Sequence, residues 1–206
     1  QGHIQTLVHC SSSEAYGTAK GDDVMNENHP LDPVTPYAAS KAAEDHVVLS
    51  YSQTFGINTV VVRPFNNFGP RQNAGAYAGI IPIVVDRVKN DLPIEIFGDG
   101  LQTRDYIFVR DTANAIIGVY ESVSTRGRVI NIASGQEISV NDLVRRLLKV
   151  MGTPNYPIIH ISPRPGDVRR HCGGVESLKK LTGFEPKAIT DENLRETVQW
   201  YMEKSQ

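Results

Sequence analysis

Tyr37 and Lys41, four residues apart, form the first pair of side chains that could carry out chemistry. Thr35 and Pro36 directly before them favour the start of a helix, because threonine caps an N-terminus and proline fits the first helical position. Side chains at positions i and i+4 share one helix face, so the lysine ammonium can favour the phenolate form of the tyrosine. A phenolate is a base, so the pair indicates proton transfer.

The spacing of this pair is not specific by itself. Tyr16 and Lys20 show the same spacing, although Gly17 lies between them in a stretch typical of a turn. An ordinary surface helix would also carry a tyrosine and a lysine four residues apart. The spacing alone therefore leaves a catalytic and a structural interpretation of Tyr37 open.

A run of hydroxyl and carboxyl side chains follows the first apolar segment. Residues 6–10 are expected to form a buried strand, and this strand runs into Ser11, Ser12, Ser13 and Glu14. Ligands of open α/β sheets bind at the carboxyl ends of the strands, so these side chains can face a substrate. A polar turn that caps a helix has the same composition, and the pattern leaves both interpretations open.

Three further loops combine glycine with side chains that recognise phosphate. They span residues 63–72, 97–106 and 164–167. Backbone amides of glycine turns and guanidinium groups both bind diphosphates, so the loops indicate a diphosphate ligand. The alternative for Arg104 is a structural ion pair with Asp105 or Asp111.

The elements that must position these residues are those of an α/β protein. The chain has 206 residues, of which 40% are hydrophobic, enough for a sizeable core. Short apolar segments alternate with amphipathic ones, a pattern typical of a mostly parallel sheet with helices on its faces. The expected strands are 6–10, 59–62 and 129–132, and the expected helices are 36–55, 80–88, 111–122, 140–151, 176–181 and 191–203.

Composition argues against several classes of partner. The formal net charge is −2, and no lysine or arginine cluster indicates binding to nucleic acid or to a membrane surface. No apolar segment approaches the roughly 18 residues of a membrane-spanning helix. Cys10 and Cys172 lie far apart, without the spacing of a metal site or a disulfide framework. We therefore expect no metal and a cytoplasmic location.

In their order and spacing, these motifs resemble those of the extended short-chain dehydrogenase/reductase family, specifically its nucleotide-sugar epimerases and dehydratases. The resemblance extends from Leu7 to Tyr201. Family members bind NAD on a Rossmann domain that opens with a glycine-rich turn, and they pack a smaller domain over the nucleotide sugar. That turn is absent here, because Gly98-Asp99-Gly100 lacks the third glycine and comes too late in the chain. We therefore expect that about a hundred N-terminal residues are missing and that tight NAD binding requires them.

The resemblance also implies a division of the chain. Residues 1–69 and 97–123 are expected to be the rear part of the Rossmann domain, with the catalytic motif. Residues 70–96 and 124–206 are expected to form a smaller, mixed α/β domain that binds the nucleotide sugar. Family members commonly pair through the helix that carries the tyrosine and the lysine, so a homodimer is expected.

The same resemblance implies a role for each motif residue. Tyr37 exchanges a proton with the sugar 4-hydroxyl, Lys41 favours the phenolate and holds the cofactor ribose, and Ser12 hydrogen-bonds the 4-oxygen. The implied cofactor-binding residues are Ser11, Tyr37, Lys41 and Pro64, and the implied substrate-binding residues are Asn66, Arg71, Gln102, Arg104, Arg164 and Asp167. A UDP- or dTDP-hexose is the implied substrate. At Cys172-Gly173-Gly174 the chain departs from the family, which leaves altered nucleoside contacts and a shortened helix cap both open.

Ser13 and Glu14 bear on which reaction follows the oxidation of the sugar. A 4,6-dehydratase needs a base for the C5 proton, and Glu14 occupies that position; many dehydratases carry aspartate where this chain has Ser13, a poor acid. The loop 71–79 instead looks like that of hexose 4-epimerases. We favour 4,6-dehydration over 4-epimerisation, with decarboxylation of UDP-glucuronate third, although relatives with that activity usually have serine in place of Asp105. A truncated, non-catalytic module that binds a sugar nucleotide or a partner protein is the alternative from another class.

Overall fold

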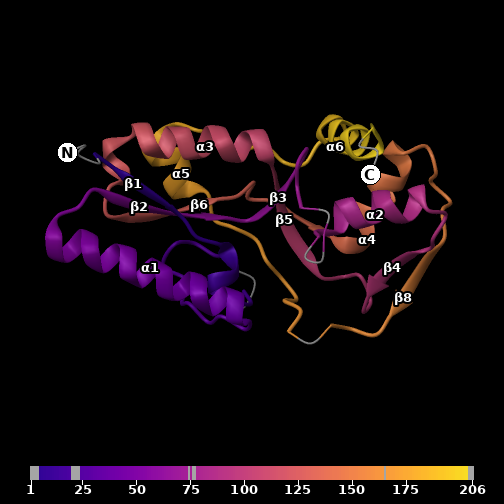
Figure 1. The fold of residues 1–206 in the computed structure, drawn as a ribbon, viewed down its shortest axis with the longest axis horizontal. Coiled ribbons are helices and arrows are strands. Elements are labelled where there is room, and N and C mark those ends of the chain that lie inside the picture. The colour runs from indigo at the N-terminus through magenta and orange to yellow at the C-terminus, as the bar shows by residue number, and fades with distance from the viewer. Residues whose placement is uncertain (1–4, 20–23, 74, 76–77, 165, 204–206) are drawn as a thin grey trace.

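The computed structural model describes residues 5–19, 24–73, 75, 78–164 and 166–203. These residues form an elongated α/β molecule with two bodies side by side (Figure 1). The strands are β1 (Leu7–Cys10), β2 (Thr59–Pro64), β3 (Asn66–Phe68), β4 (Ile94–Phe97), β5 (Thr103–Phe108), β6 (Arg128–Ile132), β7 (Glu137–Ser139) and β8 (Ile158–Ile161). The helices are α1 (Pro36–Phe55), α2 (Ile80–Lys89), α3 (Val109–Glu121), α4 (Val140–Val150), α5 (Glu176–Thr182) and α6 (Asp191–Glu203), with short 3-10 turns η1 (Ser13–Tyr16) and η2 (Val123–Thr125). The mixed α/β class expected from the sequence is confirmed.

The first body is a three-stranded parallel sheet between helices. Its strand order is β1-β2-β6, with α1 on one face and α3 and α5 on the other (Figure 1). Every residue of β2 is buried, as expected for a central parallel strand that is covered on both faces. Val62 and Ile130 pack with Ala115 and Leu178 in one apolar cluster. Burial of this cluster holds α3 and α5 against the sheet.

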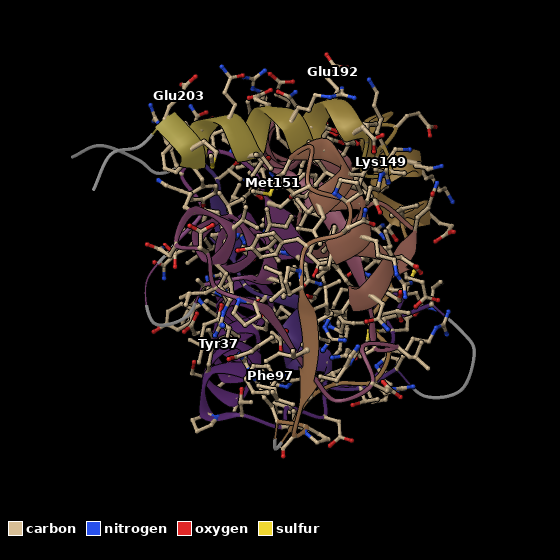
Figure 2. All side chains as sticks on the ribbon, turned by 90° about the vertical axis from the view of Figure 1, so that its right-hand side faces the viewer. Tyr37, Phe97, Lys149, Met151, Glu192 and Glu203 are labelled. Carbon is tan, nitrogen blue, oxygen red and sulfur yellow. The ribbon has the colours of Figure 1, made fainter. Side chains whose placement is uncertain are left out.

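The second body joins two small sheets to a layer of three helices. β5 pairs with β3 in parallel and with β7 antiparallel, while β4 and β8 form a parallel pair. Its core packs Leu143 and Leu147 of α4 against Val84 of α2 and Leu194 of α6. Figure 2 views this body end-on and shows Glu192 and Glu203 on the outer side of α6. The helix thus buries one face and presents charge on the other.

Local caps explain why α1 begins and ends where the sequence predicts. The Thr35 hydroxyl accepts a hydrogen bond from the backbone N–H of Ala38 at 3.1 Å, and Pro36 occupies the first helical position. Gly56 ends the helix in the left-handed conformation with φ 65°, which costs glycine little. The N-cap that the Thr35 side chain forms stabilises the helix by about 1 kcal/mol.

Strand pairing crosses the expected domain boundaries. β6 lies in the range 124–206 that was expected to form the substrate domain, yet it hydrogen-bonds with β2. β5 and its parallel partner β3 lie in the ranges 97–123 and 1–69 that were expected to belong to the Rossmann domain, yet β5 also pairs with β7 of the range 124–206. The division into functional domains stays a prediction. In the part of the chain that the structure describes, no helix is long and apolar enough to span a membrane.

Gly173 lies in the segment that departs from the family pattern, and it is closely packed. A Cβ atom at this position would lie 2.5 Å from Ala133 Cβ and 2.8 Å from the Phe65 ring. We expect Gly173→Ala to lower the free energy of unfolding by about 1–3 kcal/mol, because the tightly packed neighbours can move only at a cost in free energy. Gly118→Ala is the control. Gly118 lies in α3, and a Cβ atom there would meet Thr182 of α5 at an ordinary contact distance of 3.5 Å. Urea unfolding measures both, and an equally stable Gly173→Ala protein would contradict the steric argument.

Candidate active site

A pocket of about 570 Å³ brings together most of the residues expected to bind substrate. It is lined by residues of η1, β3, α2, β4, β5 and α4, of the segments before α2 and β5, and of the loop before α5. Among the expected site residues, Glu14, Asn66, Gln102, Arg104, Arg164 and Asp167 line it. These residues are up to 153 positions apart in the chain, and the fold places them around one cavity.

Arg104 and Gln102 both hold Asp167. The Arg104 guanidinium donates to Asp167 Oδ1 at 2.6 Å, and the Gln102 amide donates to Asp167 Oδ2 at 3.4 Å and to the Phe97 carbonyl at 3.0 Å. The ion-pair partner of Arg104 is therefore Asp167, and neither Asp105 nor Asp111, the two partners that the sequence suggested. An arginine that is already oriented in this way presents its remaining N–H groups with little loss of entropy on binding.

Phe97 was not recognised as a site residue from the sequence. Its ring lies under Arg164, with the guanidinium carbon 3.8 Å from the ring centroid, an arrangement that stabilises the cation. Gln72 also lines the pocket, and its Oε1 atom has no hydrogen-bond partner among the described residues. Its neighbour Arg71 is exposed, with φ 68°, and does not line the pocket. The structure thus brings Gln72, not Arg71, to the cavity.

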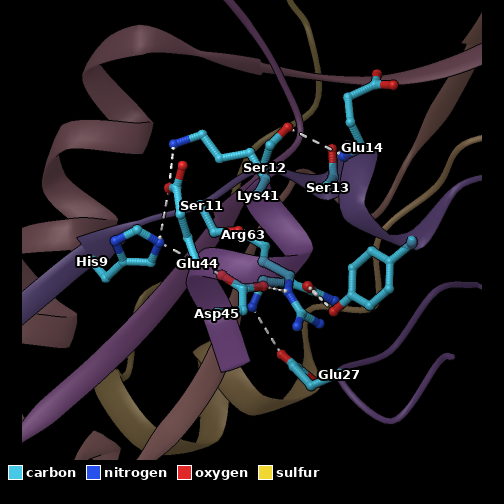
Figure 3. A network of polar contacts seen from close by, with 12 residues as sticks. His9, Ser11, Ser12, Ser13, Glu14, Glu27, Lys41, Glu44, Asp45 and Arg63 are labelled. Carbon is cyan, nitrogen blue, oxygen red and sulfur yellow. Dashed lines mark hydrogen bonds and ion pairs between the residues drawn. The ribbon is translucent and has the colours of Figure 1, made fainter. Parts of the chain in front are cut away.

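Glu14 is a half-buried carboxylate at the wall of this pocket. Burial raises its pKa, the charge of Arg104 opposes the rise, and the charge of Asp167 adds to it. Its backbone N–H donates to Ser12 Oγ at 3.2 Å, which caps η1 and leaves the serine proton free to be donated elsewhere. Figure 3 shows the Glu14 carboxylate turned away from the polar network around Asp45. A carboxylate with a raised pKa is suited to accept and return a proton.

Tyr37 and Lys41 lie at the N-terminal end of α1 and are not among the residues that line the pocket. The Tyr37 side chain is 56% exposed. The Lys41 ammonium donates to Glu44 Oε2 at 2.8 Å and to the Cys10 carbonyl at 3.4 Å. The hydrogen bond to Glu44 is the largest cause of the raised pKa of Lys41, and the charge of Tyr37 raises it further. The lysine is thus held by Glu44, and it couples to the phenol electrostatically.

Two residues expected to contact the cofactor end neighbouring strands. Ser11 follows β1 and is 6% exposed, and its buried Oγ atom has no hydrogen-bond partner in the described residues. Pro64 is the buried last residue of β2. An unpaired buried hydroxyl costs free energy, so this position fits a polar ligand at the strand ends. Within the described ranges, no group of histidine, cysteine and acidic side chains could hold a metal ion.

A buried polar network beneath the site escaped the sequence analysis (Figure 3). Arg63 Nε donates to Asp45 Oδ2 at 2.8 Å, and its guanidinium lies 4.5 Å from the centroid of the Tyr16 ring. The Tyr16 hydroxyl donates to Asn131 Oδ1 at 2.8 Å, and burial raises the pKa of Tyr16 to about 12. Tyr16 is therefore part of the core rather than a base. Lys20 lies outside the described residues, as does Pro165 in the loop 164–167.

Asp105 is a second buried carboxylate, and it joins three segments. It accepts hydrogen bonds from the Ser134 hydroxyl at 2.6 Å and from the backbone N–H groups of Ser134, Gly135 and Gly173 at 2.8, 3.0 and 3.1 Å. Burial raises its pKa, and these four donors oppose the rise. The backbone carbonyl of Asp105 accepts a hydrogen bond from Asn66 Nδ2 at 3.2 Å. Asp105 thus also positions Asn66, one of the residues expected to bind substrate.

His171 supports the serine motif from behind. Its Nε2 atom lies 3.3 Å from the Ser13 carbonyl, the residue is 1% exposed, and burial, followed by the charge of Arg104, lowers its pKa to about 4. The native imidazole stays neutral while an unfolded histidine protonates near pH 6.5, so acid favours unfolding. We expect stability to fall by about 3 kcal/mol as the pH drops from about 6.5 to 4. Urea unfolding across this range measures the slope.

His171→Gln should remove this part of the pH dependence, because glutamine does not titrate. The matched control is His160→Gln, since His160 lies at the surface. A slope that survives His171→Gln would assign the effect to other groups.

Comparisons with known proteins agree with this geometry. The model of the "NAD dependent epimerase/dehydratase family" matches residues 1–133. The dTDP-glucose 4,6-dehydratase of Actinoplanes sp. is 34% identical over 199 residues, which cover 97% of this chain and 61% of that protein. The structure of a UDP-N-acetylglucosamine 4-epimerase from Methanobrevibacter ruminantium aligns with a TM-score of 0.90 and 33% identity, over 97% of this chain and 63% of that one. A dTDP-glucose 4,6-dehydratase from Bacillus anthracis, solved with NAD, aligns with a TM-score of 0.87 and 31% identity, over 96% and 61%.

The chain therefore belongs to the NAD dependent epimerase/dehydratase family, within the extended short-chain dehydrogenases/reductases. The family predicted from the sequence motifs is confirmed. The chain spans less than two thirds of the length of these relatives.

Proposed function

We propose that the protein modifies a nucleotide-linked hexose through a 4-keto intermediate, with NAD as cofactor and 4,6-dehydration as the outcome. The observation that carries this proposal is the pocket, where the Glu14 carboxylate and the guanidinium groups of Arg104 and Arg164 share one cavity. Guanidinium groups hold a diphosphate, and a carboxylate of raised pKa exchanges protons near neutrality. The dTDP-glucose 4,6-dehydratases among the relatives support this choice.

The strand ends beside α1 fit the cofactor. The buried Ser11 hydroxyl lacks a partner among the described residues, and Tyr37 is exposed beside Lys41. NAD supplies the reversible oxidation of the sugar carbon. The Bacillus anthracis relative was solved with NAD, which supports the same cofactor here.

The residues of this chain then have separate tasks. Tyr37 takes the proton of the 4-hydroxyl while the Lys41 cation stabilises the phenolate, and the Ser12 hydroxyl donates to the same sugar oxygen. Glu14 removes the C5 proton, which the neighbouring ketone has made acidic. Because the hydroxyl of Ser13 is a poor acid, Glu14 also passes this proton to the 6-hydroxyl, which leaves as water. The product would then gain the hydride at C6 from the reduced cofactor and a proton from solvent at C5. Arg104, oriented by Asp167, holds the diphosphate.

The second candidate is 4-epimerisation, in which the keto sugar turns over and no base is required at C5. The observation in its favour is Gln72, which lines the pocket from the loop 71–79. The epimerase from Methanobrevibacter ruminantium among the relatives also supports it. For either reaction we propose a UDP- or dTDP-hexose as substrate, a cytoplasmic location and a homodimer. The exposed Val47, Tyr51 and Phe55 on α1 support pairing through that helix.

Incubation in deuterium oxide separates these reactions. The complete gene product would be incubated with dTDP-glucose or UDP-glucose, and the products analysed by mass spectrometry. Loss of water with uptake of deuterium supports dehydration. An unchanged mass with inverted C4 overturns it in favour of epimerisation, and binding without conversion supports a non-catalytic module.

A further inference from the structure

Lys41 is held by a group of side chains to which the proposed reaction gives no role. Glu44 lies one helical turn after Lys41, and its Oε2 atom accepts from the ammonium at 2.8 Å. The His9 Nε2 atom on β1 lies 3.5 Å from the same oxygen. The carbonyl of Cys10, the next residue on β1, is 3.4 Å from the ammonium. Figure 3 shows His9, Glu44 and Lys41 together at the junction of β1 and α1.

The hydrogen-bond capacity of the lysine makes this arrangement informative. An ammonium has three N–H donors. One is directed to Glu44 and one to the Cys10 carbonyl, so the protein fixes two of the three directions. A single N–H remains for an external acceptor. The side chain has lost much of its freedom before any ligand arrives, which lowers the entropic cost of binding.

The neighbouring carboxylate cannot take over this task. Asp45 is buried, and its Oδ2 atom accepts from Arg63 at 2.8 Å. His9 Nε2 lies 3.7 Å from the other oxygen of Asp45 and so stands between the two carboxylates. Glu44, in contrast, has a side chain that is 43% exposed, so its position depends on the hydrogen bond with Lys41.

We propose that Glu44 is a positioning residue for Lys41. Its carboxylate and the Cys10 carbonyl orient the ammonium so that the remaining N–H faces a hydroxyl of the cofactor ribose or the Tyr37 phenolate. The nature of the ligand rests on the proposed function. The orientation of Lys41 is a property of this chain that can be measured without catalysis.

The first test follows the ionisation of Lys41 in protein labelled with carbon-13 at lysine, by NMR across the alkaline range. Glu44→Gln should lower the pKa of Lys41, because the hydrogen bond and the negative charge that stabilise the ammonium are lost. Glu44→Asp keeps the charge and should restore part of the difference. Glu121→Gln is the control, since it removes an exposed carboxylate from α3, on the opposite face of the sheet. An unchanged Lys41 titration in Glu44→Gln overturns the proposal.

The second test is a double-mutant cycle on NAD binding, measured by calorimetry with the complete gene product. Glu44→Gln should weaken binding about two- to fivefold, the range of exposed ion pairs. The same substitution in the Lys41→Met background should have no effect, because Glu44 then has nothing to orient. Equal weakening in both backgrounds overturns the proposal, since Glu44 would act independently of the lysine. Absence of NAD binding would contradict the proposed function, while the lysine titration would still decide the role of Glu44.

Discussion

Glu14→Gln is expected to lower the rate of dehydration by about 10²- to 10⁴-fold, the usual contribution of a general acid or base. Glutamine keeps the shape of the side chain in the pocket but cannot accept the C5 proton. Oxidation of the sugar at C4 depends on Tyr37, so reduced cofactor should still form. Absorbance of the reduced nicotinamide measures this step, and deuterium uptake from solvent measures the loss of the C5 proton.

Gln102→Glu is a useful control for Glu14→Gln, because it changes the charge of the same cavity by one unit without touching the proposed base. It should weaken nucleotide-sugar binding, since a second carboxylate would compete for Arg104, but it should not prevent deuterium uptake. Undiminished formation of the dehydrated product by Glu14→Gln would show that Glu14 is not the C5 base, and the dehydration itself would then depend on another residue.

Asp105→Ala is expected to have the largest effect on stability. It leaves four buried donors without an acceptor: the hydroxyl and N–H of Ser134 and the N–H groups of Gly135 and Gly173. Each unsatisfied buried donor costs about 1–3 kcal/mol, so the free energy of unfolding should fall by more than about 4 kcal/mol. Thermal and urea unfolding measure the loss.

Asp99→Ala is the control that separates the effect of burial on stability from the effect of the number of hydrogen bonds lost. Asp99 also accepts several hydrogen bonds, two of them from Arg169, but it is exposed. Water can replace its partners, and the change in stability should be small. Similar losses for Asp99→Ala and Asp105→Ala would mean that the burial of Asp105 contributes little.

The helices could be predicted from the sequence because the signals that bound them are local. Thr35 and Gly56 act on residues within one turn of themselves, and Ser139 caps the N–H of Asp142 three residues on. The ends predicted for helices 36–55 and 191–203 match the structure, and the others differ by a few residues. The strands β3, β4, β5, β7 and β8 were not recognised. β5 contains Thr103, Arg104 and Asp105, polar residues whose partners lie far along the chain, so no alternating pattern marks it.

The same distinction applies to the site. The motifs marked Glu14, Arg104 and Asp167 as site residues, and the fold places all three around the pocket. The contacts between them could not be derived from spacing. Two acidic residues near Arg104 were plausible partners, yet its partner is 63 positions away. Lys41 lies close enough in sequence to pair with either Tyr37 or Glu44, and its ammonium donates to Glu44. Side-chain reach allows several pairings, and only the fold selects among them.

The interleaved order of the strands bears on how the molecule acquires its structure. β2 pairs with β6 across the whole of α2, β4, β5 and α3, and β4 pairs with β8 across α4. The layer of α2 and α4 is completed by α6, the last helix. Contacts of such long sequence separation form slowly, because much of the chain must be ordered before they are made. On the ribosome, the pocket can therefore assemble only after β8 and the loop with Arg164 and Asp167 have been synthesised, and until then the apolar side chains of α2 and β4 lack part of their packing partners.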